Sequence, residues 1–510
     1  MEEAEEPKRH CMNNKCTSWV INQIKKRLPI VVWFPKYQWK EHVGADLIAG
    51  VTLMFVNVPQ GLAFSVLANV DLIYGLYTSC LASLLYCFMG TVPVSSFGPV
   101  AVGSMLTGEV VATVNNPNYT TNEIAVAVTF LIGVWYLIGF IVRLGVLSMI
   151  FRKPFVSGFI TACACHILSK SVKLVFGIKS GNKYGMFSFF LNIYALYQKF
   201  DRINYPTVII SIVVIFILIL NICVVRPVVA KFTKLVLPME AIIMSISILV
   251  SYYCSFEEKG VPVVGKVPSG FPSIIVPDIN LIQEVWAMSL VVALVNYSTT
   301  IAMVSLFNNE VDSDQELFAM GVANLVCSNF QCIVIGNSMM RTVISVSLGV
   351  KSLLATIISS LLLVFVLLFP MSVHIPTANK KMKTEMLSLM NLRAGPLFHS
   401  LPICVLGCII LTAASQLLIQ RLKEIRSIWR KSLEDGFIWA SAFAAGLILD
   451  LDKGMVVGAL FSIRQILIEK QTAEVMEQRA LKEQTALEQG LLEPEKANLL
   501  DERKRDDKNV

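Results

Sequence analysis

Charged residues are scarce in this sequence, and their scarcity excludes an ordinary soluble globular protein. Only 15% of the 510 residues are Asp, Glu, Lys or Arg, whereas 55% are hydrophobic, and the mean hydropathy is +0.65. The hydrocarbon of a bilayer contains no water, so a spanning chain must pair its backbone groups within helices or a closed barrel. The apolar runs have the length of helices rather than of short alternating strands. The sequence therefore predicts an all-α polytopic membrane protein.

A cleavable signal peptide and a metal-binding pattern are also missing. The charged N-terminus is not followed by a short apolar run with a small-residue cleavage site, so the first span is expected to act as the insertion signal. The closest cysteines, Cys163 with Cys165 and Cys404 with Cys408, stand in apolar sequence without other ligands, which favours core packing over a metal site or disulfides. We expect no metal, no cofactor, no catalytic group and no nucleic-acid partner.

The apolar segments form two sets of seven. Residues 1–42 are predicted to be a cytoplasmic arm, and its end alternates aromatic and basic residues that suit the headgroup level. The domains that follow are 43–252 (first repeat), 253–286 (extracellular connection), 287–468 (second repeat) and 469–510 (short cytoplasmic tail, with the composition of a helix). An odd number of spans per set would relate the two sets by inverted symmetry. The fold class is therefore 14 transmembrane segments in a 7+7 inverted repeat.

Basic residues predict the orientation in the bilayer. They gather in three connections, 143–153, 226–234 and 421–431. Cytoplasmic connections carry an excess of Lys and Arg, so we expect both termini in the cytoplasm, with the plasma membrane as the location. The connection 372–400 departs from this pattern, because it contains three lysines but should lie outside. Asn118 begins a glycosylation sequon on the outer side, whereas the sequon at Asn296 lies in a span and should stay unmodified.

Two short segments, the third and the tenth, occupy corresponding positions in the two sets. They have roughly 18 and 13 residues, against the ~20 needed to span a bilayer. A helix beginning near Phe97 to Pro99 would carry Pro99 in its first turn, where the missing N–H costs nothing. A second half-helix beginning near Ser338 would point a like dipole at the membrane centre. The pattern predicts an anion site between the two helix N-termini, although Gly98 and Pro99 could instead be a simple kink.

Three side chains near these segments are candidates for contact with the anion. Arg341 is the charged residue between Phe318 and Lys351, and an intramembrane arginine usually faces a cavity or a counter-charge. It is predicted to supply positive potential, with a structural ion pair as the alternative. Gln60 and Phe64 are four residues apart, so they share one helix face beside an expected break at Pro59. Gln60 could donate to the anion or could satisfy a kinked backbone.

The eighth segment, Val285 to Phe307, contains no acidic residue. A proton-coupled carrier generally needs an ionisable group in the membrane near its substrate. The absence favours exchange or facilitated movement over proton symport. His166 could titrate, but beside Cys163 and Cys165 it is interpreted as a packed core residue.

Several ordered motifs resemble the SulP (sulfate permease) anion transporters, in particular the animal branch that includes prestin and pendrin. The similarity covers roughly residues 28–470. The motifs are Trp33 to Tyr37, Pro59 to Phe64, Tyr74 to Ser79, Gly98 to Val102, Pro154 to Phe159, Asp314 to Leu317 and Asp450 to Gly454. The resemblance implies a core domain (segments 1–4 and 8–11) that moves against a gate domain (5–7 and 12–14) as an elevator. It also implies that the anion site is lined by Gln60, Phe64, Val100, Ala101, Met339, Met340 and Arg341.

The sequence departs from the family pattern at three points. Val100 replaces a phenylalanine that is common in animal relatives, and Met340 replaces a serine that often precedes the arginine. Both changes leave the preferred anion open. The family also carries a cytoplasmic STAS domain after the last span, whereas this sequence ends about forty residues later. Whether a homodimer forms without that domain is left open.

The resemblance and the predicted site together favour a membrane transporter over an enzyme. We expect secondary active exchange of sulfate or a similar small inorganic or organic anion for chloride, bicarbonate or oxalate. The alternatives are a chloride/bicarbonate exchanger, a channel-like anion conductor, and a non-transporting motor or regulatory membrane protein. A nucleobase permease is a further alternative, but that family typically uses acidic residues in the eighth and tenth segments, and this sequence has none there.

Overall fold

The protein is described by a computed structural model. It describes residues 22–23, 25–114, 116–145, 153–178, 183, 185–232, 236–265, 270, 272–305, 307, 311–368, 398–449 and 451–488. The N-terminal helices are α2 (Ile30–Trp33), α3 (Trp39–Ala68), α4 (Leu72–Met89), α5 (Ala101–Val114), α6 (Thr121–Ile141), α7 (Lys153–Val175), α8 (Ser188–Gln198), α9 (Tyr205–Leu220), α10 (Arg226–Phe232) and α11 (Met239–Tyr253). The later helices are α12 (Ile279–Val304), α13 (Ser313–Ser328), α14 (Met339–Ser347), α15 (Leu354–Leu368), α18 (Ile403–Lys431), α19 (Leu433–Ile448) and α20 (Leu451–Glu488).

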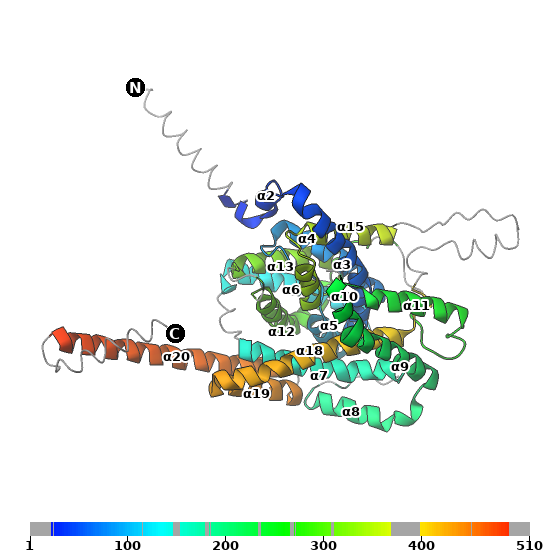
Figure 1. Cartoon of the computed structure of the whole chain (residues 1–510). Coiled ribbons are helices and arrows are strands. Elements are labelled where there is room, and N and C mark those ends of the chain that lie inside the picture. The colour runs from blue at the N-terminus through cyan, green and yellow to red at the C-terminus, as the bar shows by residue number, and fades with distance from the viewer. Residues whose placement is uncertain are drawn as a thin grey trace, which may run out of the picture.

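A helix lies in each apolar segment predicted from the sequence, so the prediction of a helical membrane fold is confirmed at this coarse level (Figure 1). Among the described residues, 7 helices are long and apolar enough to cross a membrane on their own. The helices α5, α11 and α15 are apolar but shorter. The number of 14 spans therefore stays a prediction.

Three local predictions differ from the structure. The all-α prediction does not include two short strands, β1 (Phe97–Pro99) and β2 (Ile335–Asn337), which form an antiparallel pair. Pro99 consequently lies in a strand, and α5 begins at Ala101 rather than at Phe97. Pro59 causes no break, because α3 continues through it. Two extended segments can lie inside an apolar fold because each pairs the backbone groups of the other.

One further helix was not predicted, and one predicted helix is confirmed. The helix α8 was not predicted, since its segment is too short for a span and has several exposed aromatic side chains. The predicted tail helix is confirmed to Glu488, and it continues α20 without interruption. The three lysines of the connection 372–400 lie outside the described residues.

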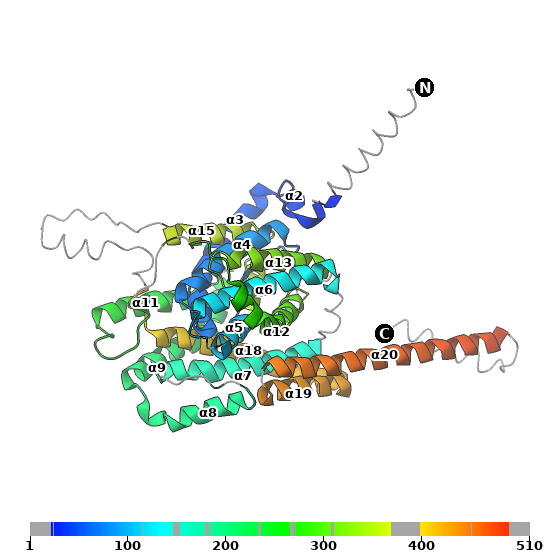
Figure 2. The same cartoon turned by 180° about the vertical axis from the view of Figure 1, so that it is seen from behind.

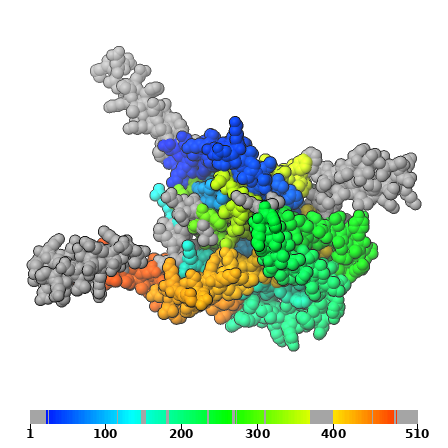
Figure 3. Space-filling view, in the orientation of Figure 1, coloured from blue at the N-terminus to red at the C-terminus, as the bar shows by residue number. Residues whose placement is uncertain are grey.

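The helices pack in two groups. The first group contains α3 to α6 and α12 to α15, where α3 contacts α4 and α15, and α6 contacts α12 and α13. The second group contains α7, α9 to α11 and α18 to α20, where α7 contacts α18 and α19. Figure 2 shows the same arrangement from behind. In Figure 3 the blue helices α2 and α3 lie with α15 at one end of the molecule, while α8, α18 and α19 lie at the other.

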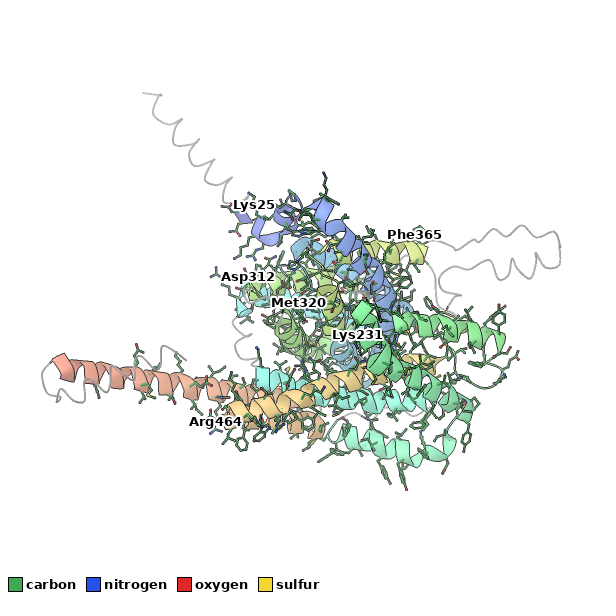
Figure 4. The ribbon with its side chains drawn as sticks, viewed as in Figure 1. Lys25, Lys231, Asp312, Met320, Phe365 and Arg464 are labelled. Atoms are coloured by element: carbon green, nitrogen blue, oxygen red, sulfur yellow. The ribbon has the colours of Figure 1, made fainter. Side chains whose placement is uncertain are left out.

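The interior of the first group is tightly packed. Met320 on α13 is fully buried there, whereas Lys231 lies exposed at the end of α10 in the second group (Figure 4). The helices α3 and α4 approach so closely that a Cβ on Gly75 would lie 2.0 Å from the carbonyl oxygen of Gly61. Small residues permit such approach in membranes, where packing rather than water exclusion drives helix association.

Candidate anion-binding site

The two strands cross at the centre of the first group and bring two helix starts together. Gly98 pairs with Gly336 in the register of the ladder, and the N–H of Ser338 donates to the carbonyl oxygen of Ser96 at 3.2 Å. The helix α5 follows β1 directly, and α14 follows β2. Because the strands are antiparallel, the short ladder places the N-termini of α5 and α14 at its two ends, facing each other across it.

Both helix starts leave backbone N–H groups without helical partners. In α5 the first helical hydrogen bond runs from the N–H of Ser104 to the carbonyl oxygen of Val100 at 2.8 Å. In α14 it runs from the N–H of Thr342 to the carbonyl oxygen of Ser338 at 3.0 Å, and no side chain caps this end. The positive end of each helix dipole is thus aimed at the strand crossing.

Side-chain amides hold the second strand. The N–H of Ile335 donates to Oδ1 of Asn324 at 3.0 Å, and Nδ2 of Asn296 donates to the carbonyl oxygen of Ile335 at 2.8 Å. Both amides are fully buried. The first strand is held differently: the ring of Phe97 stacks on that of Tyr86 with 3.6 Å between the centroids. Polar bonds and aromatic packing therefore fix the two halves of the crossing.

Arg341 lies behind the crossing rather than at an open surface. Its side chain is fully buried, with Nη1 donating to Oε1 of Gln60 at 3.3 Å and Nη2 donating to the carbonyl oxygen of Pro99 at 3.2 Å. A Cβ on Gly98 would lie 2.9 Å from Nη2. No carboxylate in the described parts of the chain forms an ion pair with this guanidinium. Arg341 thus ties α14 to α3 and β1, and its charge reaches the helix starts through the protein interior.

A cavity of about 650 Å³ opens in front of the two helix starts. Seven of the residues predicted for the anion site line it: Gln60, Phe64, Val100, Ala101, Ser338, Met339 and Met340. Pro99 and Arg341 are not in the lining, because they form the layer behind it. The opposite wall comes from α7, α10 and α18 of the second group. The structure therefore brings the predicted residues together in a cleft between the two helix groups.

Asn337 is a lining residue that the sequence analysis missed. Its Oδ1 accepts a hydrogen bond from the hydroxyl of Thr342 at 2.9 Å. That contact leaves Nδ2 buried and without a partner. A buried donor without an acceptor costs about 1–3 kcal/mol, so an acceptor in the cavity would stabilise it. The residue lies in β2, just before the half-helix that was expected to begin near Ser338, so the sequence analysis assigned it no role.

Arg226 is a second lining residue that the sequence analysis did not assign to the site. It had been counted only among the basic residues that predict orientation, yet it lines the cavity from α10 together with Asn221, Gln416 and Gln420 of the second group. Only the tertiary fold brings these positions opposite Gln60.

Glu240 lies beside the same cavity at the first turn of α11. It lines a small adjoining cavity with Arg226 and Met340, and its Oε2 is buried without a hydrogen-bond partner. Arg226 and Gln60 are the groups that interact with its carboxylate. The segment from Val285 to Phe307 contains no acidic residue, but the structure brings an ionisable group to the site from a different helix, α11.

Three further positions that were discussed from the sequence have the following surroundings. Asn118 is exposed in the turn before α6, and Asn296 is fully buried. His166 is buried, with Nε2 3.1 Å from the carbonyl oxygen of Gly446. Within the described ranges, no group of three or more His, Cys, Asp and Glu side chains could hold a metal ion.

Comparison with known proteins identifies the family. Residues 44–378 and 383–442 match the sulfate permease family model. Prestin from Homo sapiens is 30% identical over 484 residues, covering 90% of this chain and 61% of prestin. The anion exchange transporter of Homo sapiens is 28% identical, covering 87% of this chain and 67% of that protein. The chain thus spans about 60% of the length of the prestins that it matches.

Solved structures share the fold. The murine solute carrier 26 family member A9 anion transporter, in its inward-facing state, matches with a TM-score of 0.76 and 25% identity, covering 89% of this chain and 72% of that one. The transmembrane domain of the cyanobacterial bicarbonate transporter BicA matches with a TM-score of 0.62 and 14% identity, covering 82% and 97%. The chain belongs to the sulfate permease family of membrane anion transporters.

Proposed function

We propose that this protein is a secondary active anion transporter that exchanges sulfate or a similar small anion for chloride, bicarbonate or oxalate. The proposal is carried by one observation: the N-termini of α5 and α14, the latter without a side-chain cap, meet the unpartnered Nδ2 of Asn337 at a cavity. Free N–H groups and positive dipole ends bind anions without a formal charge in contact. Arg341 adds positive potential from behind, and Phe64 walls the pocket.

The two helix groups suggest how the anion crosses the membrane. The first group supplies α3, α5 and α14 to the cavity, and the second supplies α7, α10 and α18. Binding at the boundary of two bodies suits an elevator movement of one against the other. We propose that the first group is the core domain, the second is the gate domain, and the fourteen segments form the inverted repeat predicted from the sequence.

The cavity is proposed to open toward the cytoplasm. Its lining includes Arg226, Val229 and Ala230 of α10 and, from α18, Gln416, Leu417 and Gln420. These stretches adjoin the basic connections that the positive-inside rule assigns to the cytoplasm. We therefore propose an inward-facing state, in the orientation that the basic connections predict.

Exchange in proteoliposomes tests the proposal. Radiolabelled sulfate, chloride and oxalate are taken up into vesicles preloaded with each anion, with and without a pH gradient. We expect uptake that depends on the anion inside, independent of a proton gradient. Sulfate uptake that requires an inward proton gradient would contradict exchange. Uptake that does not depend on the internal anion would indicate a channel, and competition by uracil would indicate a nucleobase permease.

A further inference from the structure

A second cavity lies at the opposite end of the same cleft. It has a volume of about 310 Å³ and is lined by the ends of α3 and α7 and the starts of α9 and α18. The central cavity is lined by the other parts of these helical segments, for example at Asn221 in the π-helical turn (Asn221–Val225) that continues α9. Thr207 and Asn221 are 14 positions apart, which corresponds to ~21 Å along a helix. The two cavities thus mark the two ends of one path between the helix groups.

The second cavity is basic and contains an unused donor. Lys170 and Lys173 of α7 line it. Lys173 is only 3% exposed, and its Nζ donates to Oδ1 of Asn192 at 2.8 Å. Thr207 is only 1% exposed, and its hydroxyl has no hydrogen-bond partner. Two ammonium groups and a buried hydroxyl in one cavity match the requirements of a small anion.

A third cavity leads away from the second one. Its volume is about 540 Å³, and it shares Gly177, Ile178 and Pro262 with the second cavity. Lys199 and Arg202 line it, and Glu257 is the acidic residue in its lining. Positive charge along the walls of a cleft raises the local concentration of anions.

We propose that Lys170, Lys173 and Thr207 form a second binding site for small anions, at the end of the cleft opposite the central cavity, and that Lys199 and Arg202 attract anions to it. The proposal deepens the proposed transport function and rests on it. In the predicted orientation this end faces outside, so the site receives the external anion before the central site becomes accessible.

On two helices, α3 and α7, only a few residues separate the lining of the central cavity from that of the second cavity. Phe64 lines the central cavity and Leu67 lines the second one, and the same spacing of three residues separates Ile167 from Lys170. Three residues correspond to ~4.5 Å along a helix. A shift of α3 against α7 by about one turn would therefore transfer an anion from one site to the other.

Sided uptake measurements test the site. The variants are Thr207→Val, which preserves shape, Lys170→Gln, and the double variant Lys199→Gln with Arg202→Gln. The control is Lys153→Gln, an exposed lysine at the other end of α7. We expect the half-saturating concentration of external chloride or sulfate to rise about 3- to 10-fold in the three variants. The internal half-saturating concentration should stay unchanged, and the effect of the double variant should shrink at high ionic strength.

A binding measurement separates this proposal from the transport proposal. Chloride and sulfate should raise the melting temperature of the full chain in detergent, and part of the shift should persist in Arg341→Gln. Adding Thr207→Val and Lys170→Gln to that variant should abolish the remainder. If wild-type protein transports nothing but shows this pattern, the second site stands and the transport proposal fails. Unchanged external half-saturation together with an unchanged residual shift would overturn the second site.

Discussion

The two strand–helix units at the centre, β1–α5 and β2–α14, share an architecture but differ in how they are held. In the first unit the one charged residue is Glu109, in the middle of α5, and the strand is supported by the stacking of Phe97 on Tyr86 and by the hydroxyl of Ser83, which donates to the carbonyl oxygen of Phe97. The second contains Arg341 and is supported by the amides of Asn296 and Asn324. The contribution of apolar packing to stability is spread over many weak contacts, whereas that of a buried amide comes from a few directed hydrogen bonds.

This difference assigns separate tasks to the two units. The second unit carries the buried positive charge of Arg341 and the bonds from the side-chain amides, so single substitutions there should affect anion binding strongly. The first unit supplies close backbone approach, so its sensitivity should concentrate at the glycines. The four predictions below test this division, beginning with the largest expected effect.

Arg341→Gln should reduce anion uptake about 10- to 100-fold, because the buried guanidinium makes charge-assisted bonds to both Gln60 and Pro99. Radiolabelled uptake normalised to surface expression measures the effect. Arg430→Gln, at an exposed position on α18, is the control. Unchanged uptake in Arg341→Gln would show that the charge of the second unit has no role in transport.

The paired glycines compare the units directly. In Gly98→Ala the new Cβ would lie 2.9 Å from Nη2 of Arg341, and in Gly336→Ala it would lie 2.6 Å from Oδ1 of Asn296. We expect uptake to fall about tenfold in Gly98→Ala with normal expression, because the guanidinium must move. Gly336→Ala should instead lower expression and melting temperature, because it disturbs a buried amide network.

Gly44→Ala is the control for both glycine variants, since nothing lies within 4 Å of the added Cβ. If Gly98→Ala and Gly336→Ala give the same loss of expression and of uptake, the proposed division of tasks is wrong.

Asn324→Ala should destabilise the protein by about 1–3 kcal/mol, since it leaves the N–H of Ile335 buried without an acceptor. The melting temperature in detergent measures the change. Phe97→Leu, the matched change in the first unit, should cost less than about 1.5 kcal/mol, because it replaces one apolar side chain by another. A larger loss in Phe97→Leu than in Asn324→Ala would reverse the comparison.

Glu240→Gln should produce the smallest effect, a rise of about 3- to 5-fold in the affinity for sulfate relative to chloride. The carboxyl group lies beside Arg226 at the cavity, and in its ionised form it repels anions, a divalent anion more strongly than a monovalent one. Competition of sulfate against chloride uptake measures the ratio. A fall in the affinity for sulfate relative to chloride would contradict this role. It would show that Glu240 favours anion binding, for example by holding Arg226 in position.

Much of the fold and part of the site could be predicted from the sequence. Apolar runs of helix length identify the membrane segments, because a segment in hydrocarbon must pair its own backbone groups and therefore forms a helix. Gln60 and Phe64 could be assigned to one face by their spacing. The strand pair could not be predicted, because three residues form no recognisable alternation and their hydrogen-bond partners lie some 240 positions away.

The roles of the charged residues depended most on the tertiary structure. The sequence alone identified Arg341 as unusual, because a charge within an apolar segment is costly wherever it points. Its position behind the crossing, the place of Arg226 and Glu240 at the cavity, and the free amide of Asn337 were decided by packing between distant segments. Hydropathy is a local property of the chain, so the sequence by itself determined a helical membrane protein and its two short segments. Electrostatic contact depends on distances of a few ångströms between groups from separate helices, which only the folded structure sets.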